Sequence, residues 1–188
     1  MKLNKKIIII LVIIFVILFT LIKVIKIQDY ILKHLYPQKY TEQVEKYAEE
    51  YKVDKNYIYA IIKAESNFEE NAKSNSGAKG LMQIMDNTAK DVAISLGMEY
   101  QEYYELYNSD INIMFGTKYF SMLLKDYNNN VNLALAAYNA GKGNVKKWID
   151  NGILSADGEN IENIPFKETN MYVRKILQNY KIYNKLYK

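Results

Sequence analysis

Residues 57–66, with the sequence YIYAIIKAES, predict a helix that carries one acid on its apolar face. Four side chains recur at i, i+3, i+4 and i+7, the spacing that places residues on one side of a helix. They are Ile58, Ile61, Ile62 and Glu65. Asp54, just before this stretch, is expected to be the N-cap of the helix. The pattern therefore predicts a buried helix face that ends in a carboxyl group.

The position of Glu65 suggests acid chemistry. Contact with apolar surface and the negative end of the helix dipole both disfavour its charged form. A glutamate that keeps its proton near neutral pH can act as a general acid. The alternative is that Glu65 lies at the rim of the apolar face and is turned to water, as most glutamates are.

Three further motifs follow Glu65 along the chain. Residues 77–85 (GAKGLMQIM) contain two glycines three apart, which allow a tight turn and a close approach of the backbone to a ligand. Gln83 in this run offers both a donor and an acceptor, as sugar hydroxyls and acetamido groups require. Residues 136–141 (AAYNAG) are typical of a helix end capped by glycine. Residues 164–173 (IPFKETNMYV) predict a proline turn that leads into the last helix.

In this order and at these spacings, the motifs resemble those of the lytic transglycosylase family, whose SLT domain is lysozyme-like. The matching residues are Glu65-Ser66, residues 77–85 without Lys79, Thr88-Ala89, residues 137–141, Glu168-Thr169 and Tyr172-Val173. The resemblance covers about residues 40 to 185. Two positions depart from the family's pattern. Asp86 stands where a proline is usual, and we expect it to cap the next helix; Asn170 stands where an arginine is frequent.

The resemblance implies cleavage of the bond between N-acetylmuramic acid and N-acetylglucosamine in peptidoglycan, without hydrolysis. Glu65 is expected to protonate the glycosidic oxygen and then to accept a proton from the C6 hydroxyl of the sugar, which closes a 1,6-anhydro ring. The substrate's acetamido group would stabilise the cationic intermediate, so that one carboxylate suffices where most glycosidases use two.

Two other functions stay open. One is a lysozyme-type hydrolase on the same fold, which would use a further acid such as Glu69, Glu70 or Asp86. The other is a glycan-binding scaffold without catalytic activity. The products released from peptidoglycan distinguish the first of these from a lytic transglycosylase, and binding without turnover would indicate the second.

Seven residues besides Glu65 are expected to form the substrate site. They are Ser74, Gln83, Met85, Tyr138, Asn139, Glu168 and Tyr172. Chemistry and resemblance together suggest that Ser74 and Gln83 hydrogen-bond the muramic unit and that Met85 packs against the sugar.

The aromatic and acidic members of this set are expected to lie near the reacting bond. Tyr138 would hold Glu65 or the sugar, and Tyr172 is a second candidate of the same kind. Glu168 would orient groups around the cleavage site, or alternatively cap the start of its helix.

An apolar segment near the N-terminus predicts a membrane anchor. Residues 7–22 are almost uninterrupted in their apolar character, and with Lys23 and Lys26 snorkelling the segment reaches about 21 residues, enough to span a bilayer. Branched residues follow in place of a small-x-small cleavage site, which favours an uncleaved signal anchor over a cleaved signal peptide. Three lysines precede the segment and favour a cytoplasmic N-terminus. We therefore expect a single-pass protein of the cell membrane with its catalytic domain on the extracytoplasmic side.

Charge and residue content exclude several classes of function. The formal net charge of +4 comes from the five lysines in residues 1–27, and the remaining chain carries 20 basic and 21 acidic residues. This balance argues against a nucleic-acid partner. The absence of cysteine excludes a disulfide framework and a thiolate nucleophile, and the single histidine, His34, cannot form a zinc cluster. We expect no metal and no cofactor, with peptidoglycan strands and the membrane as partners; a partner in the cell-wall or secretion machinery stays unidentified.

The expected fold is mainly α: a lysozyme-like helical domain with at most a vestigial hairpin, preceded by one N-terminal transmembrane helix. Residues 1–27 would form a cytoplasmic stub and the anchor, 28–39 a juxtamembrane linker, and 40–188 the catalytic domain. Helices are expected at 41–51, 55–65, 87–96, 110–127, 131–140, 144–150 and from 166 onward, with the hairpin between 69 and 84. Thr41 and Asp110 are further expected N-caps, and Gly97 is expected to end its helix.

Overall fold

The computed structural model describes residues 5–98 and 105–187, and for residues 5–10 and 12 it describes the backbone alone. The chain divides into two units. Helix α1 (Lys5–Leu35) belongs to the first, and Gln38–Lys185 form the second. The boundary falls beside Pro37, within the range 28–39 that is expected to form the juxtamembrane linker.

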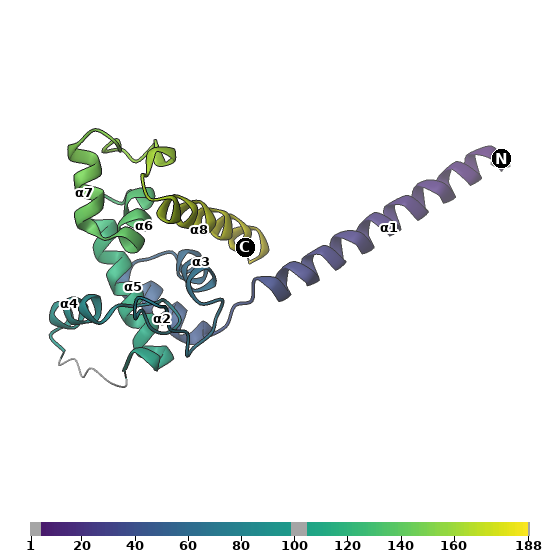
Figure 1. Cartoon of the computed structure of the whole chain (residues 1–188). Coiled ribbons are helices and arrows are strands. Elements are labelled where there is room, and N and C mark those ends of the chain that lie inside the picture. The colour runs from purple at the N-terminus through teal and green to yellow at the C-terminus, as the bar shows by residue number, and fades with distance from the viewer. Residues whose placement is uncertain (1–4, 99–104, 188) are drawn as a thin grey trace. The chain divides into compact units, whose positions relative to one another are not determined.

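Helix α1 is continuous and drawn as a single ribbon in Figure 1. Most of its described apolar side chains are exposed, as with Phe15 at 68%, whereas Leu32 is half-buried. Within the described residues, no helix combines the length and the apolar character needed to cross a membrane. Of residues 1–27, the expected stub and anchor, residues 1–4 lie outside the described residues, as do the side chains of residues 5–10 and 12. The anchor therefore stays a prediction.

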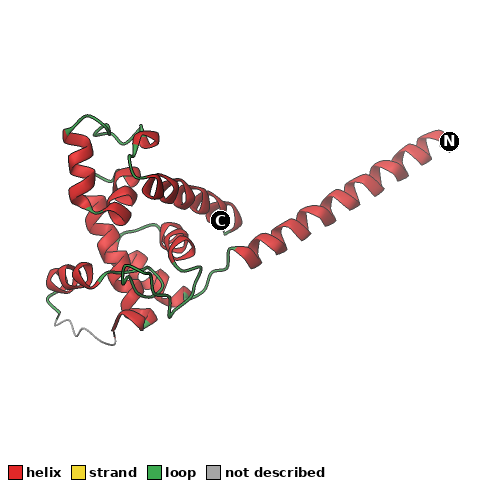
Figure 2. Ribbon diagram, in the orientation of Figure 1, coloured by secondary structure: helices red, strands yellow, loops and turns green. Residues whose placement is uncertain are grey.

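The second unit is built from helices and loops (Figure 2). Its helices are α2 (Thr41–Tyr51), α3 (Lys55–Glu65), α4 (Asp86–Leu96), α5 (Ser109–Asp126), α6 (Val131–Ala140), α7 (Lys142–Asp150) and α8 (Lys167–Leu186), with short 3₁₀ turns η1 (Glu105–Tyr107) and η2 (Ile161–Asn163). In the described part of the chain, extended pairing is limited to two isolated bridges, between Lys73 and Lys79 and between Lys79 and Ile84. This agrees with the expected vestigial hairpin.

Helix α5 organises the unit, since it lies against α2, α4, α6 and η1 (Figure 1). Its inner face buries Ile113, Phe115 and Phe120 completely. On the same helix, a Cβ at Gly116 would lie only 2.4 Å from Sδ of Met82. The glycine therefore lets the segment that contains Met82 pack directly on the α5 backbone. This contact fixes one wall of the site described below.

Two of the expected helix boundaries are confirmed by their hydrogen bonds. The Asp54 carboxylate accepts the backbone N–H of Asn56 at 2.9 Å, and so caps α3. Gly97 ends α4 in a left-handed conformation with φ of 65°. Both signals are local, because a capping group and its partner lie within one turn of each other.

Three expected N-caps are wrong. The residue before α2 is Tyr40, in a left-handed conformation with φ of 56°, and Thr41 instead directs its hydroxyl to the carbonyl of Gln38 at 3.3 Å. Helix α4 begins at Asp86 itself, whose carboxylate pairs with the Lys79 ammonium at 2.8 Å and leaves Met85 at the cap position. In each case a partner outside the predicted capping pattern engages the side chain.

The third case is Asp110. Helix α5 begins one residue earlier than expected, because the Asn108 side chain accepts the N–H groups of Asp110 at 2.9 Å and Ile111 at 3.2 Å. The Asp110 carboxylate accepts a hydrogen bond from the hydroxyl of Tyr47, at 2.8 Å. It therefore joins α5 to α2. Helix α7 likewise begins at Lys142, two residues before the expected start.

Candidate active site

A pocket of about 230 Å³ opens at the C-terminal end of α3. Its walls come from α3, the loop between α3 and α4, the end of α6 and the start of α8. The lining residues are Glu65, Ser74, Ser76, Ala78, Gln83, Met85, Tyr138, Asn139 and Glu168. Tyr172 is the one residue of the expected set that does not line it. Helix ends from distant parts of the sequence thus bring the expected residues to one place.

Glu65 sits against the apolar core. Ile58, Ile61 and Ile62 are completely buried, and Glu65 itself is only partly exposed. Burial raises the pKa of Glu65 to about 7; the hydrogen bond from Tyr172 and the charge of Lys175 act in the opposite direction, and the charge of Glu168 adds to the rise. A carboxyl group with this pKa is protonated in a large fraction of molecules at neutral pH. The solvated-rim alternative does not describe this side chain.

Tyr172 lies behind Glu65 and not on the pocket wall. Its side chain is buried, and its hydroxyl donates to Oε1 of Glu65 at 2.6 Å. Burial raises the pKa of Tyr172 well above its ordinary value, so the phenol keeps its proton and remains a donor. Tyr172 therefore contacts the acid, one of the two roles expected for a tyrosine at this site, and a contact with substrate stays a prediction.

Tyr138 reaches the pocket from α6, but its hydrogen bond differs from the expected one. The hydroxyl donates to the backbone carbonyl of Met82 at 2.9 Å, and the ring packs against Tyr119 and Phe120 with centroids at 5.3 and 6.3 Å. This bond ties α6 to the loop that carries Gln83 and Met85. Tyr138 thus joins two walls of the pocket.

The loop between α3 and α4 holds its polar side chains by internal hydrogen bonds. The amide nitrogen of Gln83 donates to the carbonyls of Gly80 at 2.9 Å and Ala72 at 3.1 Å. Oγ of Ser74 accepts the N–H of Ala78 at 2.9 Å. Ser66, next to Glu65, directs its hydroxyl to the carbonyl of Leu81 at 2.8 Å. The loop is therefore fastened to the end of α3.

Asn112 of α5, which was not among the residues expected at the site, holds this loop by hydrogen bonds. Asn112 of α5 is completely buried; its Oδ1 accepts the N–H of Met82 at 2.7 Å, and its Nδ2 donates to the carbonyls of Lys79 at 2.9 Å and Leu106 at 2.8 Å. Gly80 leaves room for it, since a Cβ there would lie 2.3 Å from Nδ2 of Asn112. An asparagine on the apolar face of α5 was the available signal.

The start of α8 is fixed by its own contacts with α6 and η2. The Thr169 hydroxyl donates to Oδ1 of Asn139 at 2.6 Å, which brings the neighbouring Glu168 to the pocket. Asn170, the departure from the family's pattern, donates to the carbonyl of Ile161 at 2.7 Å and so fastens η2 to α8. Ser76 and Ala78 complete the pocket lining without having been expected there as site residues.

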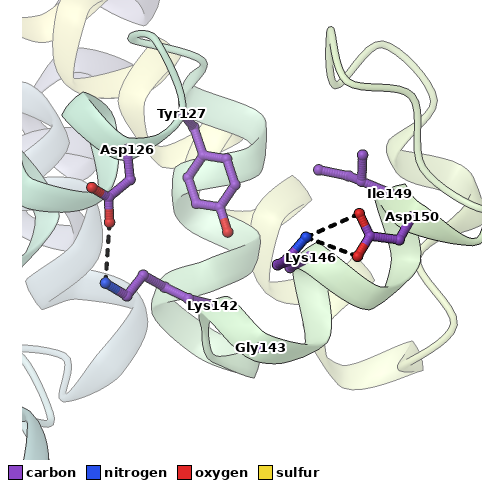
Figure 3. A pocket seen from close by; sticks show the side chains of 7 residues that line it. All are labelled: Asp126, Tyr127, Lys142, Gly143, Lys146, Ile149 and Asp150. Atoms are coloured by element: carbon purple, nitrogen blue, oxygen red, sulfur yellow. Dashed lines mark hydrogen bonds and ion pairs between the residues drawn. The ribbon is translucent and has the colours of Figure 1, made fainter.

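A larger hollow of about 490 Å³ lies between the end of α5 and α7 (Figure 3). Lys142 pairs with Asp126 at 3.1 Å and Lys146 with Asp150 at 2.9 Å, and all four side chains are exposed. Both acids of this hollow are thus paired with exposed lysines, whereas Glu65 is buried against apolar surface. Among the described residues, no cluster of three or more His, Cys, Asp or Glu is placed to hold a metal ion.

The sequence matches the family described as "Transglycosylase SLT domain" over residues 42–158. The chain belongs to this family. The matched region contains the expected site residues from Glu65 to Asn139, whereas Glu168 and Tyr172 lie beyond its end. Two side chains on α8, one lining the pocket and one bonded to Glu65, thus lie outside the region that matches the family.

Individual relatives agree with the family assignment. The soluble lytic murein transglycosylase of Salmonella typhimurium is 34% identical over 148 residues, which are 78% of this chain and 23% of the relative. The membrane-bound lytic murein transglycosylase C of Edwardsiella ictaluri is 36% identical over 137 residues, 67% of this chain and 36% of the relative. The chain therefore spans about a quarter to a third of the length of these relatives.

Solved structures of the same family share the fold. An inactive mutant of a lytic transglycosylase from Pseudomonas aeruginosa, in which a glutamate is replaced by glutamine, superposes with a TM-score of 0.75 at 35% identity and covers 82% of this chain and 25% of its own. The 70 kDa soluble lytic transglycosylase of Escherichia coli gives a TM-score of 0.75 at 32% identity, with the same coverage.

Proposed function

We propose that this SLT domain is a peptidoglycan lytic transglycosylase that cleaves the bond between N-acetylmuramic acid and N-acetylglucosamine without water. The observation that carries the proposal is the carboxyl group of Glu65, buried against apolar surface with a pKa of about 7 and facing a pocket of polar side chains. A group with this pKa can give up a proton and take one back at neutral pH.

In the first step, protonated Glu65 donates its proton to the glycosidic oxygen as the bond to C1 of the muramic unit breaks. The substrate's own acetamido oxygen stabilises the positive charge that develops at C1. In the second step, the Glu65 carboxylate removes the proton of the C6 hydroxyl while that oxygen bonds to C1, which closes the 1,6-anhydro ring. Glu65 ends the cycle protonated, so one carboxylate serves as acid and as base.

The other lining residues fit a glycan. Because the amide nitrogen of Gln83 is engaged by two backbone carbonyls, this side chain would offer Oε1 as an acceptor to a sugar hydroxyl or an acetamido N–H. Ser74 would donate its hydroxyl proton to the sugar, since its oxygen already accepts from Ala78. Met85 is 41% exposed at the pocket and would pack against the apolar face of the ring.

A relative supports the role of one glutamate. The Pseudomonas aeruginosa enzyme is inactive when one glutamate is replaced by glutamine, a change that keeps the size of the side chain and removes its acidity. We transfer this requirement to Glu65, which the motif Glu65-Ser66 and the burial of the carboxyl group both favour.

A second candidate function is a lysozyme-type hydrolase, because a second carboxylate, Glu168, lines the same pocket. In that mechanism Glu168 would either activate a water that attacks C1 or attack C1 with its own carboxylate. The other acids considered for this role, Glu69, Glu70 and Asp86, are not among the lining residues.

The products decide between these functions. The whole chain in detergent would be incubated with purified peptidoglycan and the released muropeptides weighed by mass spectrometry. We expect products lighter by one water than hydrolytic ones, absent with Glu65→Gln. Products of full hydrolytic mass would establish the hydrolase and direct attention to Glu168, whereas binding without products would favour the scaffold.

We further propose that residues 1–27 anchor the enzyme in the cell membrane, with the SLT domain on the extracytoplasmic side. The apolar run from residue 7 to 22 and the lysines before it support this, and one of the relatives is a membrane-bound enzyme. Two experiments test this proposal. Flotation of the whole chain with liposomes, followed by an alkaline wash, tests insertion into the membrane. Protease treatment of cells without an outer barrier tests on which side of the membrane the SLT domain lies. Recovery of the chain in the washed soluble fraction would contradict the anchor.

A further inference from the structure

Lys175 of α8 reaches the last turn of α3. Its Nζ donates to the backbone carbonyl of Ala64 at 2.8 Å, although the two residues are 111 positions apart in sequence. Ala64 immediately precedes Glu65. The contact therefore places an ammonium group beside the peptide that carries the acid.

The carbonyl of Ala64 is one of the four at the end of α3 that have no N–H partner in their own helix. A lysine that donates to such a carbonyl completes the hydrogen bonding of the helix end and complements the negative end of its dipole. The hydrogen bond fixes the direction of the Ala64 carbonyl group. It thereby also fixes the backbone from which the Glu65 side chain projects.

We infer that Lys175 is a positioning residue for the reaction at Glu65: its ammonium group fixes the last turn of α3 and sets the charge state in which the carboxyl group meets the substrate. The inference rests on the proposed role of Glu65. Lys175 lines no part of the pocket and acts through the helix end and through its charge.

The groups that face Glu65 come from two helices besides its own. Helix α8 contributes the Tyr172 hydroxyl, the Glu168 carboxylate and the Lys175 ammonium, and α6 contributes the Tyr138 hydroxyl. On α3 itself, Lys63 donates to the side chain of Asn67.

Lys175 is the cation that acts on Glu65 within this group, and its charge lowers the pKa of Glu65 against the effects of burial and of Glu168. Removal of the ammonium group therefore raises that pKa. The proposed reaction begins with protonated Glu65. The pH at which activity is lost on the alkaline side should therefore shift upward by the same amount as the pKa.

The test is the pH dependence of kcat/KM for the whole chain in detergent, measured with soluble glycan strands as substrate. We expect the wild-type chain to lose activity as the pH rises through about 7. Lys175→Met should move this midpoint upward by at least ~0.5 pH unit, and Lys175→Arg should restore it. Lys181→Met is the matched control, since it removes the same charge from the same exposed side chain type about 9 Å further along α8.

The inference would be overturned if Lys175→Met and Lys181→Met both had the pH midpoint of the wild-type chain, with circular dichroism showing that both variants are folded. This result would leave the proposed function intact. Titration of the Glu65 carboxyl carbon by NMR in wild type and Lys175→Met provides a readout that needs no turnover. If the wild-type chain proved inactive, the proposed function would fail, and the carbon titration would still show whether Lys175 acts on Glu65.

Discussion

The hydroxyl of Tyr172 lies 2.6 Å from Oε1 of Glu65, although 107 positions separate the two residues in sequence. The hydrogen bond joins α3, an early helix of the second unit, to α8, the last helix in the described part of the chain. The same two helices meet through the stacked rings of Tyr57 and Tyr180, whose centroids are 3.7 Å apart. The acid is therefore oriented by the docking of α8, and variants at this interface test the site without changing the acid.

Tyr172→Phe keeps the ring and removes the donor. Since the hydrogen bond lowers the pKa of Glu65, we expect that pKa to rise above about 7, and turnover to fall by about tenfold because the carboxyl group loses its orientation. The free energy of unfolding should fall by about 1 kcal/mol. Steady-state kinetics and urea denaturation measure both effects. Unchanged kcat would mean that Tyr172 serves packing alone.

Glu65→Gln should abolish turnover while it keeps the fold. General acid–base catalysis contributes typically about 10²- to 10⁴-fold, and in the proposed mechanism one group supplies both steps, so we expect a loss at or beyond the upper end of this range. Release of muropeptides is the measurement, with circular dichroism as the check on folding. Asp126→Asn, at an exposed ion pair of the other hollow, is the control and should retain activity.

The stability of the domain should depend on pH through the same carboxyl group. The pKa of Glu65 is about 7 in the folded chain and near 4.5 when the group is in water, so between these values the folded chain holds a proton that the unfolded chain has released. The contribution of Glu65 to stability is thus fully present below pH 4.5 and is lost as the pH rises through 7.

The loss amounts to roughly 3 kcal/mol for a pKa raised from 4.5 to about 7. Glu65→Gln removes the titration, so relative to wild type the variant should gain stability as the pH rises. Urea denaturation of both chains at pH 5 and pH 8 is the comparison. A difference between variant and wild type that stays constant over this range would contradict the raised pKa.

Asn112→Ala should loosen the loop that carries Gln83 and Met85. The change leaves the N–H of Met82 and the carbonyls of Lys79 and Leu106 without their partner in a buried place, which we expect to cost about 2 to 4 kcal/mol of unfolding free energy. Turnover should fall as well, because the pocket wall is no longer fixed. Asn151→Ala, at an exposed position, is the control and should change stability by less than about 0.5 kcal/mol.

Gly80→Ala should be at least as damaging at the same point. The backbone φ of 74° disfavours a side chain, and the new Cβ would lie 2.3 Å from both Nδ2 of Asn112 and the carbonyl oxygen of Leu106. Gly77→Ala is the matched comparison, since φ there is 91° but nothing lies within 4 Å of the new Cβ. Thermal unfolding of the two variants should show the larger loss for Gly80→Ala. Equal losses would mean that backbone conformation alone matters.

Features that depend on neighbours within one helical turn could be predicted from the sequence. The isoleucine spacing identified the buried face of α3, Asp54 identified its start, and Gly97 the end of α4. The same local pattern drew attention to Glu65, because an acid on an apolar stripe is visible without any knowledge of the fold. Thr41 and Asp110 were wrong as caps, since partners outside the local pattern engage their side chains.

The helices could be predicted from the sequence, because periodicity, caps and turns follow from interactions between residues a few positions apart. The local pattern also pointed to Glu65, whereas the other pocket residues were expected from the resemblance of the motifs to a known family. Three contacts depend on how the whole chain folds: Tyr172 donates to Glu65, Asn112 holds the loop, and Lys175 completes the end of α3. Each of these contacts joins segments far apart in the chain. Its geometry depends on how helices dock, and that is set by the packing of the whole core.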